Sequence, residues 1–395
     1  MKEGNGIIYM VDKLVIGHNH VMFNASLTAI IASIYDHQQV LFVAEKLHSG
    51  LIASKNSDIQ NLIFEPFEED PLPGGKLTKL LPWGKKKIGD WMFISKYIKR
   101  ANASDQNILI FTCLSASSLL YSAMKVRRKK FRSYFVLHGE LEFIFQHGLP
   151  LKNKLKGWLY KQMLKSLGEQ TSCIVLSDII KRNLVASGLV KAENVIAVDH
   201  PVITRTVKYA SKPKDPVVFG HLGIAMRKKR SEVFMELAQY FGQALEKPQP
   251  IFRLIGKMEP GFTSLSGNVE VIANNNQIIS QQEYEKNIDD VDYAIFSFDN
   301  ENYVYRVSGS LMDAICHGKP IICLKQVYIN YLFEIAGNIG FLCENVEEMK
   351  DIIGRISRRE MDVLEVYGEQ QANLEKLMLR FSVDEICKQL EAQIR

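Results

Sequence analysis

The sequence has few cysteines, and no two of them stand at a metal-binding or redox spacing. Its six cysteines are scattered through 395 residues, mostly within apolar segments. Cysteines in such positions are typical of small buried side chains in a reducing compartment. The chain also lacks an apolar run long enough to span a bilayer. Its opening residues, MKEGNGIIYMVD, have neither the apolar core nor the cleavage site of a secretory signal. These absences favour a cytoplasmic globular protein.

Low-complexity tracts and clusters of metal ligands are missing as well. His18 and His20 are one residue apart, but no third ligand follows at a suitable spacing, so we expect no metal site. Hydrophobic residues make up 47% of the chain and charged residues 24%, proportions that are ordinary for soluble globular proteins. At this length, two domains are expected rather than one large core.

Charge is distributed unevenly along the chain. Residues 1–200 hold 26 Lys and Arg against 17 Asp and Glu, whereas the whole chain holds 49 against 44. The excess lies in three runs that also contain aromatic residues, 82–100, 125–132 and 152–165. Such runs suit an anionic membrane surface, nucleic acid or an ordinary solvated face. Nucleic acid is the least favoured partner, because no recognised binding module is present and the second half is acidic.

Short, nearly all-apolar segments alternate with helical patterns along the whole chain. QVLFVAE, NILIFTC and RSYFVLHG in the first half, and VVFGHLG, YAIFSF and IICL in the second, are typical of buried parallel strands. We therefore predict an α/β protein with two tandem, Rossmann-like, doubly wound parallel sheets that face a cleft. The predicted domains are 1–202 and 217–375, joined by a polar, aperiodic linker at 203–216 and followed by a closing helix at 376–395.

The segment YRVSGSLMDAICHGKPII combines a bare backbone, a cation and one acid at the head of a predicted helix. The amides of Ser308, Gly309 and Ser310 would point out of the helix N-terminus, where the helix dipole favours an anion. Arg306 could add positive charge, and Asp313 lies one turn into the helix, where a carboxylate could hold a ribose. Alternatively, Ser308 is a simple N-cap and Asp313 complements the dipole.

A second cluster stands at the head of the same predicted domain. Gly223 ends a strand, and a basic run from Arg227 and Lys228 to Arg230 precedes a helix. Four cations at a helix N-terminus oppose its dipole, so a bound anion is expected to compensate them. Together with the Ser308–Ser310 loop, this run could clamp a diphosphate. The alternative is exposed charge at the start of a helix.

The second half of the chain resembles the donor domain of GT-B glycosyltransferases, specifically the family-4-type enzymes of bacterial polysaccharide assembly. The resemblance runs from the glycine strand and basic run at 217–230, through 280–298, to 305–322. It implies that Arg227 or Lys228 and the amides around Ser308–Ser310 bind the diphosphate of a nucleotide-sugar, and Gly223 and Arg306 are further candidates for this role from their positions in the sequence. It also implies that an acid in the helix, here Asp313, holds the ribose, and that no metal or other cofactor is needed.

The sequence departs from the family pattern at two positions. Family-4-type enzymes usually carry two glutamates separated by seven residues; here the first position is Tyr305 and the second is the shorter acid Asp313. The change at Tyr305 concerns the contacts to the transferred sugar. Glu301 is nearby but out of register, so Tyr305 and Glu301 are the candidate sugar contacts. In the first half, the resemblance indicates His138 of VLHGE as the catalytic candidate. Other candidates, less favoured, are Glu140, Glu142, Asp12 and the pair His18 and His20.

These features lead to one predicted function and two alternatives. We predict a cytoplasmic glycosyltransferase that moves a sugar from a nucleotide-diphosphate-sugar to a glycan or lipid-linked saccharide in cell-surface polysaccharide synthesis. Its basic first domain would rest on the anionic inner face of the cell membrane. One alternative is a nucleotide-sugar 2-epimerase with the same fold. The other is a catalytically silent binding subunit, because Tyr305 cannot supply the carboxylate of the family pattern.

Overall fold

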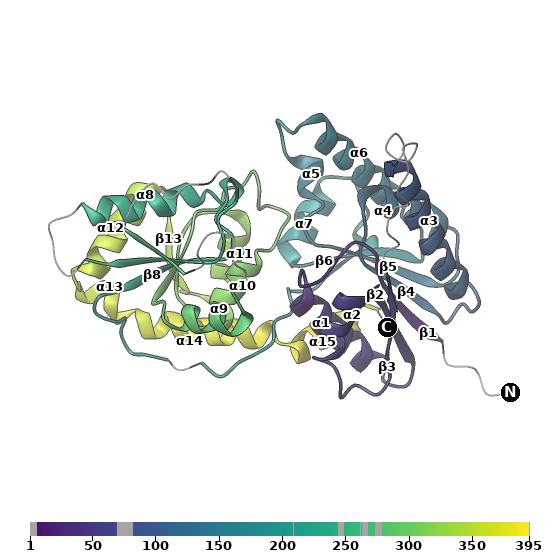
Figure 1. Ribbon diagram of the computed structural model, residues 1–395, viewed down its shortest axis with the longest axis horizontal. Helices are drawn as coiled ribbons and strands as arrows, with labels where there is room; N and C mark the ends of the chain where they lie inside the picture. The colour runs from purple at the N-terminus through teal and green to yellow at the C-terminus, as the bar shows by residue number, and fades with distance from the viewer. Residues whose placement is uncertain are drawn as a thin grey trace. The chain divides into compact units, whose positions relative to one another are not determined.

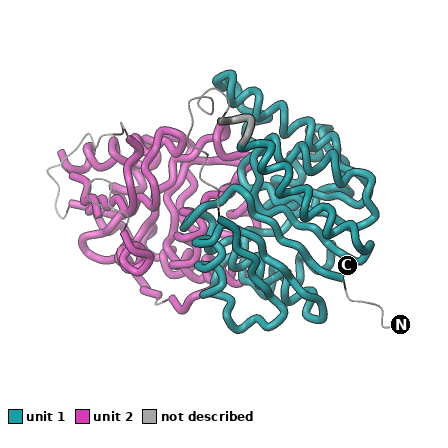
Figure 2. The backbone as a smooth tube through the Cα atoms, turned by 45° about the vertical axis from the view of Figure 1, so that its right-hand side comes forward, with its two compact units in different colours: residues 1–203, 381–395 teal, residues 204–380 magenta. Residues whose placement is uncertain are grey.

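The computed structural model describes residues 6–68, 82–207, 209–243, 249–260, 262, 268–272 and 279–394, with the side chains of 82–85 left out. The chain forms two compact units (Figure 2). Unit 1 consists of residues 1–203 and 381–395, and unit 2 of residues 204–380. Each unit is an α/β layer structure around its own parallel sheet.

Unit 1 contains a seven-stranded sheet in the order β3-β2-β1-β4-β5-β6-β7, and every strand pair is parallel. Strands β4 and β5 are buried along almost their whole length, which explains their continuous apolar sequences. Pro66 lies in β3 at the sheet edge, where the missing amide donor is tolerated. The strands are β1 (Ile7–Asp12), β2 (Gln39–Glu45), β3 (Leu62–Phe67), β4 (Ile108–Cys113), β5 (Arg132–Leu137), β6 (Thr171–Val175) and β7 (Val195–Ala197).

Helices cover both faces of this sheet (Figure 1). On one face α3 packs against α4, and α4 against α6. On the other face α1 packs against both α2 and α15, in agreement with right-handed crossovers that reverse direction at β1. The helices are α1 (Val21–Ile34), α2 (Lys46–Ala53), α3 (Pro82–Ala101), α4 (Ala116–Val126), α5 (Glu142–Phe145), α6 (Leu151–Lys165), α7 (Asp178–Ala186) and α15 (Val383–Ile394).

Unit 2 contains a six-stranded parallel sheet in the order β10-β9-β8-β11-β12-β13. The strands are β8 (Val218–Leu222), β9 (Ile251–Ile255), β10 (Val269–Val271), β11 (Tyr293–Phe296), β12 (Ile321–Leu324) and β13 (Gly340–Cys343). The helices are α8 (Ser231–Gly242), α9 (Gln281–Asp289), α10 (Gly309–Cys316), α11 (Val327–Ala336), α12 (Val346–Ser357), α13 (Met361–Glu365) and α14 (Tyr367–Arg380). A short 3-10 turn, Arg227–Lys229, precedes α8.

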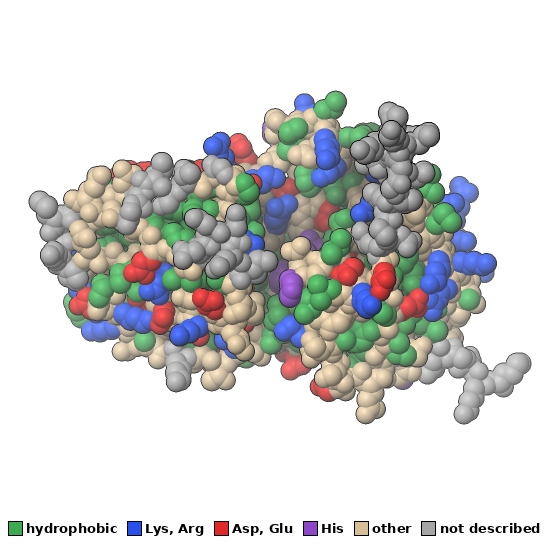
Figure 3. Space-filling view, in the orientation of Figure 1, with side chains coloured by type: hydrophobic (Ala, Val, Ile, Leu, Met, Phe, Trp, Pro, Cys, Tyr) green, Lys and Arg blue, Asp and Glu red, His purple; other side chains and the backbone are tan. Residues whose placement is uncertain are grey.

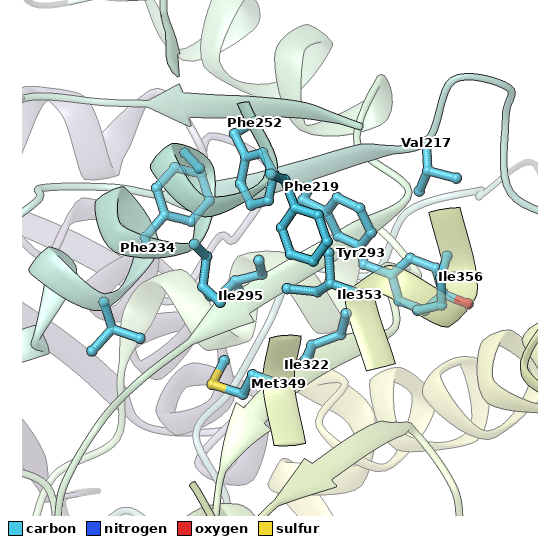
Figure 4. Close-up of a cluster of buried hydrophobic side chains, with 14 of the residues drawn as sticks. Val217, Phe219, Phe234, Phe252, Tyr293, Ile295, Ile322, Met349, Ile353 and Ile356 are labelled. Carbon is cyan, nitrogen blue, oxygen red and sulfur yellow. The ribbon is translucent and has the colours of Figure 1, made fainter. Parts of the chain in front are cut away.

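An aromatic core fixes the position of β8 in unit 2 (Figure 4). The rings of Phe219 and Tyr293 are stacked with centroids 5.9 Å apart, and Phe252 lies 5.5 Å from Phe219. Phe234 of α8 and Met349 of α12 close the cluster over the same face of the sheet. Burying such rings contributes a large share of a domain's hydrophobic stabilisation. The core therefore holds β8, β11 and the start of α8 in a fixed relation, and these elements carry the loops described below.

The two parallel sheets confirm the predicted fold class of two Rossmann-like domains. The sequence pattern did not predict two short helices, α2 and α5, because each lies between segments with a stronger strand or helix pattern. The segment 203–216 was predicted as a linker. Residue 203 belongs to unit 1 and the described residues from 204 onward to unit 2, whereas residue 208 lies outside the described residues. Arg205 donates to Glu285 (3.2 Å), and the backbone amide of Lys214 donates to Asp292 (3.1 Å). The chain passes from one unit to the other after residue 203 and again after residue 380. The sequence predicted these boundaries after residue 202 and at the start of the closing helix, residue 376.

The closing helix α15 belongs to unit 1. It packs against α1, and Gln393 exchanges hydrogen bonds with the backbone of Ala197, donating to the carbonyl (2.7 Å) and accepting from the amide (3.3 Å). Within the described part of the chain, none of the helices has the length and hydrophobicity that crossing a membrane would require.

Candidate functional site

Two crowded glycines shape the carboxyl end of β8 in unit 2. Gly223 has a φ of +76° and Gly256 a φ of +139°, a region that favours glycine. A Cβ atom on Gly256 would lie 2.3 Å from the carbonyl oxygen of Gly223. A Cβ atom on Gly223 would lie 3.3 Å from the Lys229 ammonium and 3.5 Å from Cβ of Ser310. The bare backbone of Gly223 therefore leaves space beside these two side chains.

A strained turn directs Lys229 toward this space. Arg230 adopts a left-handed conformation (φ +52°), and the Ser297 hydroxyl, just after β11, is within 3.0 Å of the Lys229 carbonyl and 2.7 Å of the Arg230 carbonyl, to which it donates. The Lys229 ammonium donates to the Ser310 hydroxyl (3.2 Å) and toward the Leu222 carbonyl (3.5 Å). The strain at Arg230 thus fixes the direction of its neighbour, as is common at functional sites.

The N-terminus of α10 lies at the same place. Ser308 is the buried N-cap residue, and its hydroxyl lies 3.0 Å from that of Ser310. Gly309 is exposed, and a Cβ atom added to it would meet no atom within 4 Å. The first amides of α10 have no partners within the helix, so this end offers open backbone donors next to a hydroxyl and an ammonium group.

Asp313 lies one turn farther along α10 and accepts a hydrogen bond from the Tyr284 hydroxyl of α9 (2.9 Å). Burial raises the pKa of Asp313 to about 6, against the hydrogen bond from Tyr284 and the charge of Lys229, which lower it. Burial also lowers the pKa of Lys229 to about 8, and the Asp313 carboxylate opposes that shift. The pKa of Tyr284 is raised well above its usual value by burial and by Asp313. An acid and a cation thus share one desolvated space.

The structure brings together five of the residues predicted from the sequence, namely Gly223, Ser308, Gly309, Ser310 and Asp313. It also shows two residues that the prediction missed as site residues, Lys229 and Tyr284. Lys229 was within the basic run but was not singled out from it, whereas Arg227 and Lys228 have exposed side chains. Tyr284 gave no sequence signal, because it is 29 residues from its partner Asp313.

The loop before α10 holds the remaining predicted residues of unit 2. The Asp299 carboxylate accepts a hydrogen bond from the backbone amide of Glu301 (3.0 Å), and the Glu301 side chain is exposed. The guanidinium carbon of Arg306 lies 5.9 Å from the centre of the Tyr303 ring. Arg306 and Tyr305 are both half-buried. A cation on an aromatic ring is stabilised by the ring quadrupole, so Tyr303 gives the Arg306 side chain a fixed support.

In unit 1, His138 follows β5 at the carboxyl edge of the sheet. Its Nε2 donates to the Thr112 carbonyl (3.2 Å), which leaves Nδ1 as an acceptor. The surrounding protein desolvates the ring and, with His20 nearby, lowers the pKa of His138 to about 3. The ring centroids of His20 and Phe23 lie 4.8 Å and 4.5 Å from that of His138. His138 is therefore a neutral ring with one free lone pair.

Several other candidates of unit 1 have structural partners. Asp12 is fully buried, where it accepts from Asn24 (2.9 Å) and from the amide of Val15 (2.9 Å). The Glu140 carboxylate accepts hydrogen bonds from the backbone amides of His138 (2.6 Å) and Gly139 (2.9 Å). Glu142 is buried in α5, whereas His18 and His20 are exposed. The carboxylates of Asp12 and Glu140 thus hold backbone in place, and that of Glu140 fixes the loop that carries His138.

The described residues contain no group of three or more His, Cys, Asp or Glu side chains placed to hold a metal ion. In unit 2, the groups placed to meet an anion are an ammonium group, hydroxyls and helix amides. Such donors bind phosphate directly.

Comparison with solved structures decides the fold. HepE from Anabaena, in complex with UDP, matches with 17% identity over 98% of both chains and a TM-score of 0.62. TarM matches with 12% identity over 99% of this chain and 98% of TarM, with a TM-score of 0.65. The chain has the GT-B fold. WaaB, a lipopolysaccharide outer core galactosyltransferase, matches it with 15% identity over 98% of this chain and 99% of WaaB, with a TM-score of 0.61.

At these identities the likeness shows the GT-B fold and does not extend to individual residues. No protein-family model matches the chain, and no curated protein matches it. The residues of the candidate site are therefore assigned from their geometry alone.

Proposed function

We propose that the protein is a glycosyltransferase that moves a sugar from a nucleotide-diphosphate-sugar to a glycan or lipid-linked saccharide in cell-surface polysaccharide synthesis. One observation carries the proposal. Gly223, Lys229, Ser310 and Asp313 come from three separate loops and helices, yet they converge at the carboxyl edge of the second sheet. Ligands of open parallel sheets bind at this edge. Support also comes from the GT-B fold, which HepE and TarM share.

The donor would be held by separate groups for its diphosphate and its ribose. The Lys229 ammonium, the Ser308 and Ser310 hydroxyls and the free amides of α10 meet the diphosphate, while Asp313 accepts from ribose hydroxyls. Arg306, supported by Tyr303, provides a second cation from the preceding loop. Because these groups neutralise the departing diphosphate, the proposal needs no metal ion or other cofactor.

During transfer, the bond between the anomeric carbon and the diphosphate oxygen breaks, and a bond to the acceptor oxygen forms. The diphosphate leaves with the electron pair and takes up the proton that the acceptor hydroxyl loses, and Lys229 and the amides of α10 stabilise its negative charge. We assign His138 to the acceptor side, where Nδ1 accepts a hydrogen bond from a sugar hydroxyl. Since the pKa of His138 is about 3, the ring stays neutral and keeps that lone pair at physiological pH.

Two of the similar structures suggest which nucleotide of the donor to test first. HepE is in complex with UDP, and TarM was also solved with UDP, together with alpha-GlcNAc-glycerol. We therefore propose a uridine nucleotide as the first donor to test, and a saccharide or a lipid-linked saccharide as the acceptor. In this proposal the enzyme works in the cytoplasm, at the inner face of the cell membrane.

A thermal-shift screen with UDP-, GDP-, ADP- and CMP-sugars tests the donor assignment, because a ligand of the native state raises its stability. We expect one nucleotide family to raise the Tm and the other three to leave it unchanged. If none of the four raises it, the donor site is wrongly assigned.

Tyr305 favours one alternative function, a binding subunit without transferase activity. Tyr305 stands where family-4-type enzymes carry a glutamate, and a protein that binds a nucleotide-sugar without transferring it would show the same thermal shift. Incubating the stabilising nucleotide-sugar with saccharide acceptors separates the two. Release of the nucleoside diphosphate with formation of a new glycosidic bond supports the transferase, whereas binding without release supports the silent subunit. An epimerase would instead convert the nucleotide-sugar into its C2 epimer, with the nucleotide still attached and no acceptor product formed.

A further inference from the structure

Helix α6 in unit 1 has two apolar faces, and only one of them packs against the protein. Its inner face is formed by Gly157, Tyr160, Met163 and Leu164, which are all buried. On the opposite face Leu151 is 84% exposed, Leu155 51% and Trp158 54%. At 3.6 residues per turn these three side chains lie within about 60° of one another around the helix axis. We call them the α6 stripe.

Lysines border the α6 stripe on both sides. The helix contains five lysines and no acidic residue. Lys152 and Lys154 are exposed at its first turn, on either side of Leu151, and Lys161 is exposed farther along. Within the described part of the chain, no carboxylate pairs with these three lysines, although such pairs are recorded elsewhere in unit 1. The α6 stripe is therefore an apolar strip bordered by uncompensated positive charge.

The same surface continues onto α3, which lies beyond α4 on the same face of the sheet. Ile88 (55% exposed) and Met92 (69% exposed) are one turn apart near the middle of α3. Between the helices, the rings of Trp91 and Tyr121 are stacked with centroids 5.2 Å apart. The cations Lys96 and Arg100, in the second half of α3, pair with Glu65 instead. Exposed apolar side chains of α3 thus lie on the same face of the sheet as the α6 stripe and its bordering lysines. Figure 3 shows green and blue side chains together where Figure 1 places α5 and the start of α6.

We propose that the α6 stripe, its bordering lysines and the exposed apolar side chains near the middle of α3 form a docking surface for an anionic phospholipid bilayer. A helix with leucine and tryptophan on one face and lysines beside them lies in the headgroup region, with its apolar side chains at the acyl boundary. Each lysine near an anionic surface adds to binding, and a tryptophan ring prefers the interface itself. A nucleic acid would use the lysines but would gain nothing from burying Leu151 and Leu155.

The position of this surface within unit 1 fits the proposed function. The helices of a parallel α/β sheet begin at the carboxyl edge of the strands, so the first halves of α3 and α6 lie at the same edge as His138, which follows β5. A bilayer there would bring a lipid-linked saccharide to the end of unit 1 that carries His138. This point alone rests on the proposed function. The docking surface itself does not.

Co-sedimentation with vesicles tests the surface, using a matched pair of variants. Leu155→Glu and Leu47→Glu change the same residue type at nearly the same exposure (51% and 53%), but Leu47 is in α2 on the other face of the sheet. The vesicles contain phosphatidylglycerol and phosphatidylcholine in equal parts, with pure phosphatidylcholine as the uncharged control. We expect Leu155→Glu to lower the partition coefficient by roughly tenfold and Leu47→Glu to leave it unchanged. Lys152→Gln with Lys154→Gln should also lower it by roughly tenfold or more.

Equal binding by Leu155→Glu and Leu47→Glu would overturn the proposal, as would equal binding to charged and uncharged vesicles. A dimer in sedimentation equilibrium that Leu155→Glu dissociates, without an effect on vesicle binding, would assign the surface to a second copy of the chain instead. Both variants should keep the Tm and the UDP affinity of the unaltered protein, because neither residue touches the donor site. Failure of the glycosyltransferase proposal would therefore leave the vesicle result interpretable, and the reverse also holds.

Discussion

The polar residues at the carboxyl edges of the two sheets differ in how they carry charge. In unit 2, Lys229 and Asp313 share a desolvated space, with pKa values near 8 and 6. In unit 1, burial lowers the pKa of His138 to about 3 and that of His200 to about 4, so both rings are neutral, and they flank Phe23. The cation of unit 2 therefore fits the charged donor that we propose, and the neutral rings of unit 1 fit the uncharged saccharide that we propose as acceptor.

Replacing His138 should separate catalysis from donor binding most clearly. We expect His138→Ala to lower kcat by roughly a hundredfold, because the ring nitrogen is held at a fixed position by the Thr112 carbonyl. The UDP affinity measured by calorimetry should not change, since His138 belongs to unit 1. His18→Ala is the control, because His18 is exposed at the same edge of the sheet. A normal kcat in His138→Ala would remove the ring from the chemistry.

Replacing Lys229 should have the largest effect on donor binding. A hydrogen bond to a charged group contributes about 1.5–3 kcal/mol. We therefore expect Lys229→Met to lower the affinity for UDP and for inorganic pyrophosphate by roughly 10- to 100-fold. Lys228→Met removes the same charge from the adjacent, exposed position and should weaken both by less than threefold, or about 0.6 kcal/mol. Equal losses in the two variants would mean that the basic run attracts the donor as a whole. In that case the turn at Arg230 has no special role.

The pKa of Lys229 also predicts how donor affinity depends on pH. The ammonium group is charged below pH 8 and loses its proton as the pH rises through that value. UDP binding should therefore weaken at alkaline pH, by roughly tenfold one pH unit above the pKa. Because bound diphosphate favours the charged form, UDP binding near pH 8 should take up protons, which calorimetry detects in buffers of different ionisation enthalpy. In Lys229→Met both effects should disappear. If they persist, another group titrates.

Most of the fold could be predicted from the sequence, because buried parallel strands are continuous apolar runs and the helices between them are amphipathic. The site could be predicted only in part. The Ser308–Ser310 loop and Asp313 are close together in the sequence, and helix geometry is enough to bring them together. Which cation of the basic run points inward depends on the left-handed Arg230 and on Ser297, which comes from another strand. Such long-range contacts leave no local pattern.

Replacing Asp313 should affect the nucleoside and spare the diphosphate. Asp313→Asn keeps the size of the side chain but removes the charge that accepts ribose hydroxyls, so we expect UDP to bind roughly fivefold more weakly. Inorganic pyrophosphate, which has no ribose, should bind as before, and competition between UDP and pyrophosphate measures both. If the affinity for pyrophosphate falls as much as the affinity for UDP, Asp313 acts by holding Lys229 in place.

The smallest change expected is in Tyr284→Phe, which removes only the hydroxyl that donates to Asp313. UDP affinity at neutral pH should fall about twofold, within the ordinary net value of one hydrogen bond. The pH dependence is the sharper measurement. Asp313 loses its charge as the pH falls through about 6, so UDP should bind more weakly on the acid side. The hydrogen bond from Tyr284 lowers the pKa of Asp313, and its removal should raise that pKa and move the acid loss of affinity toward neutral pH. If the acid limb stays in place, Tyr284 is a neighbour of Asp313 that does not tune its charge. The proposed anion site of unit 2 would then depend on Lys229 and the α10 amides alone.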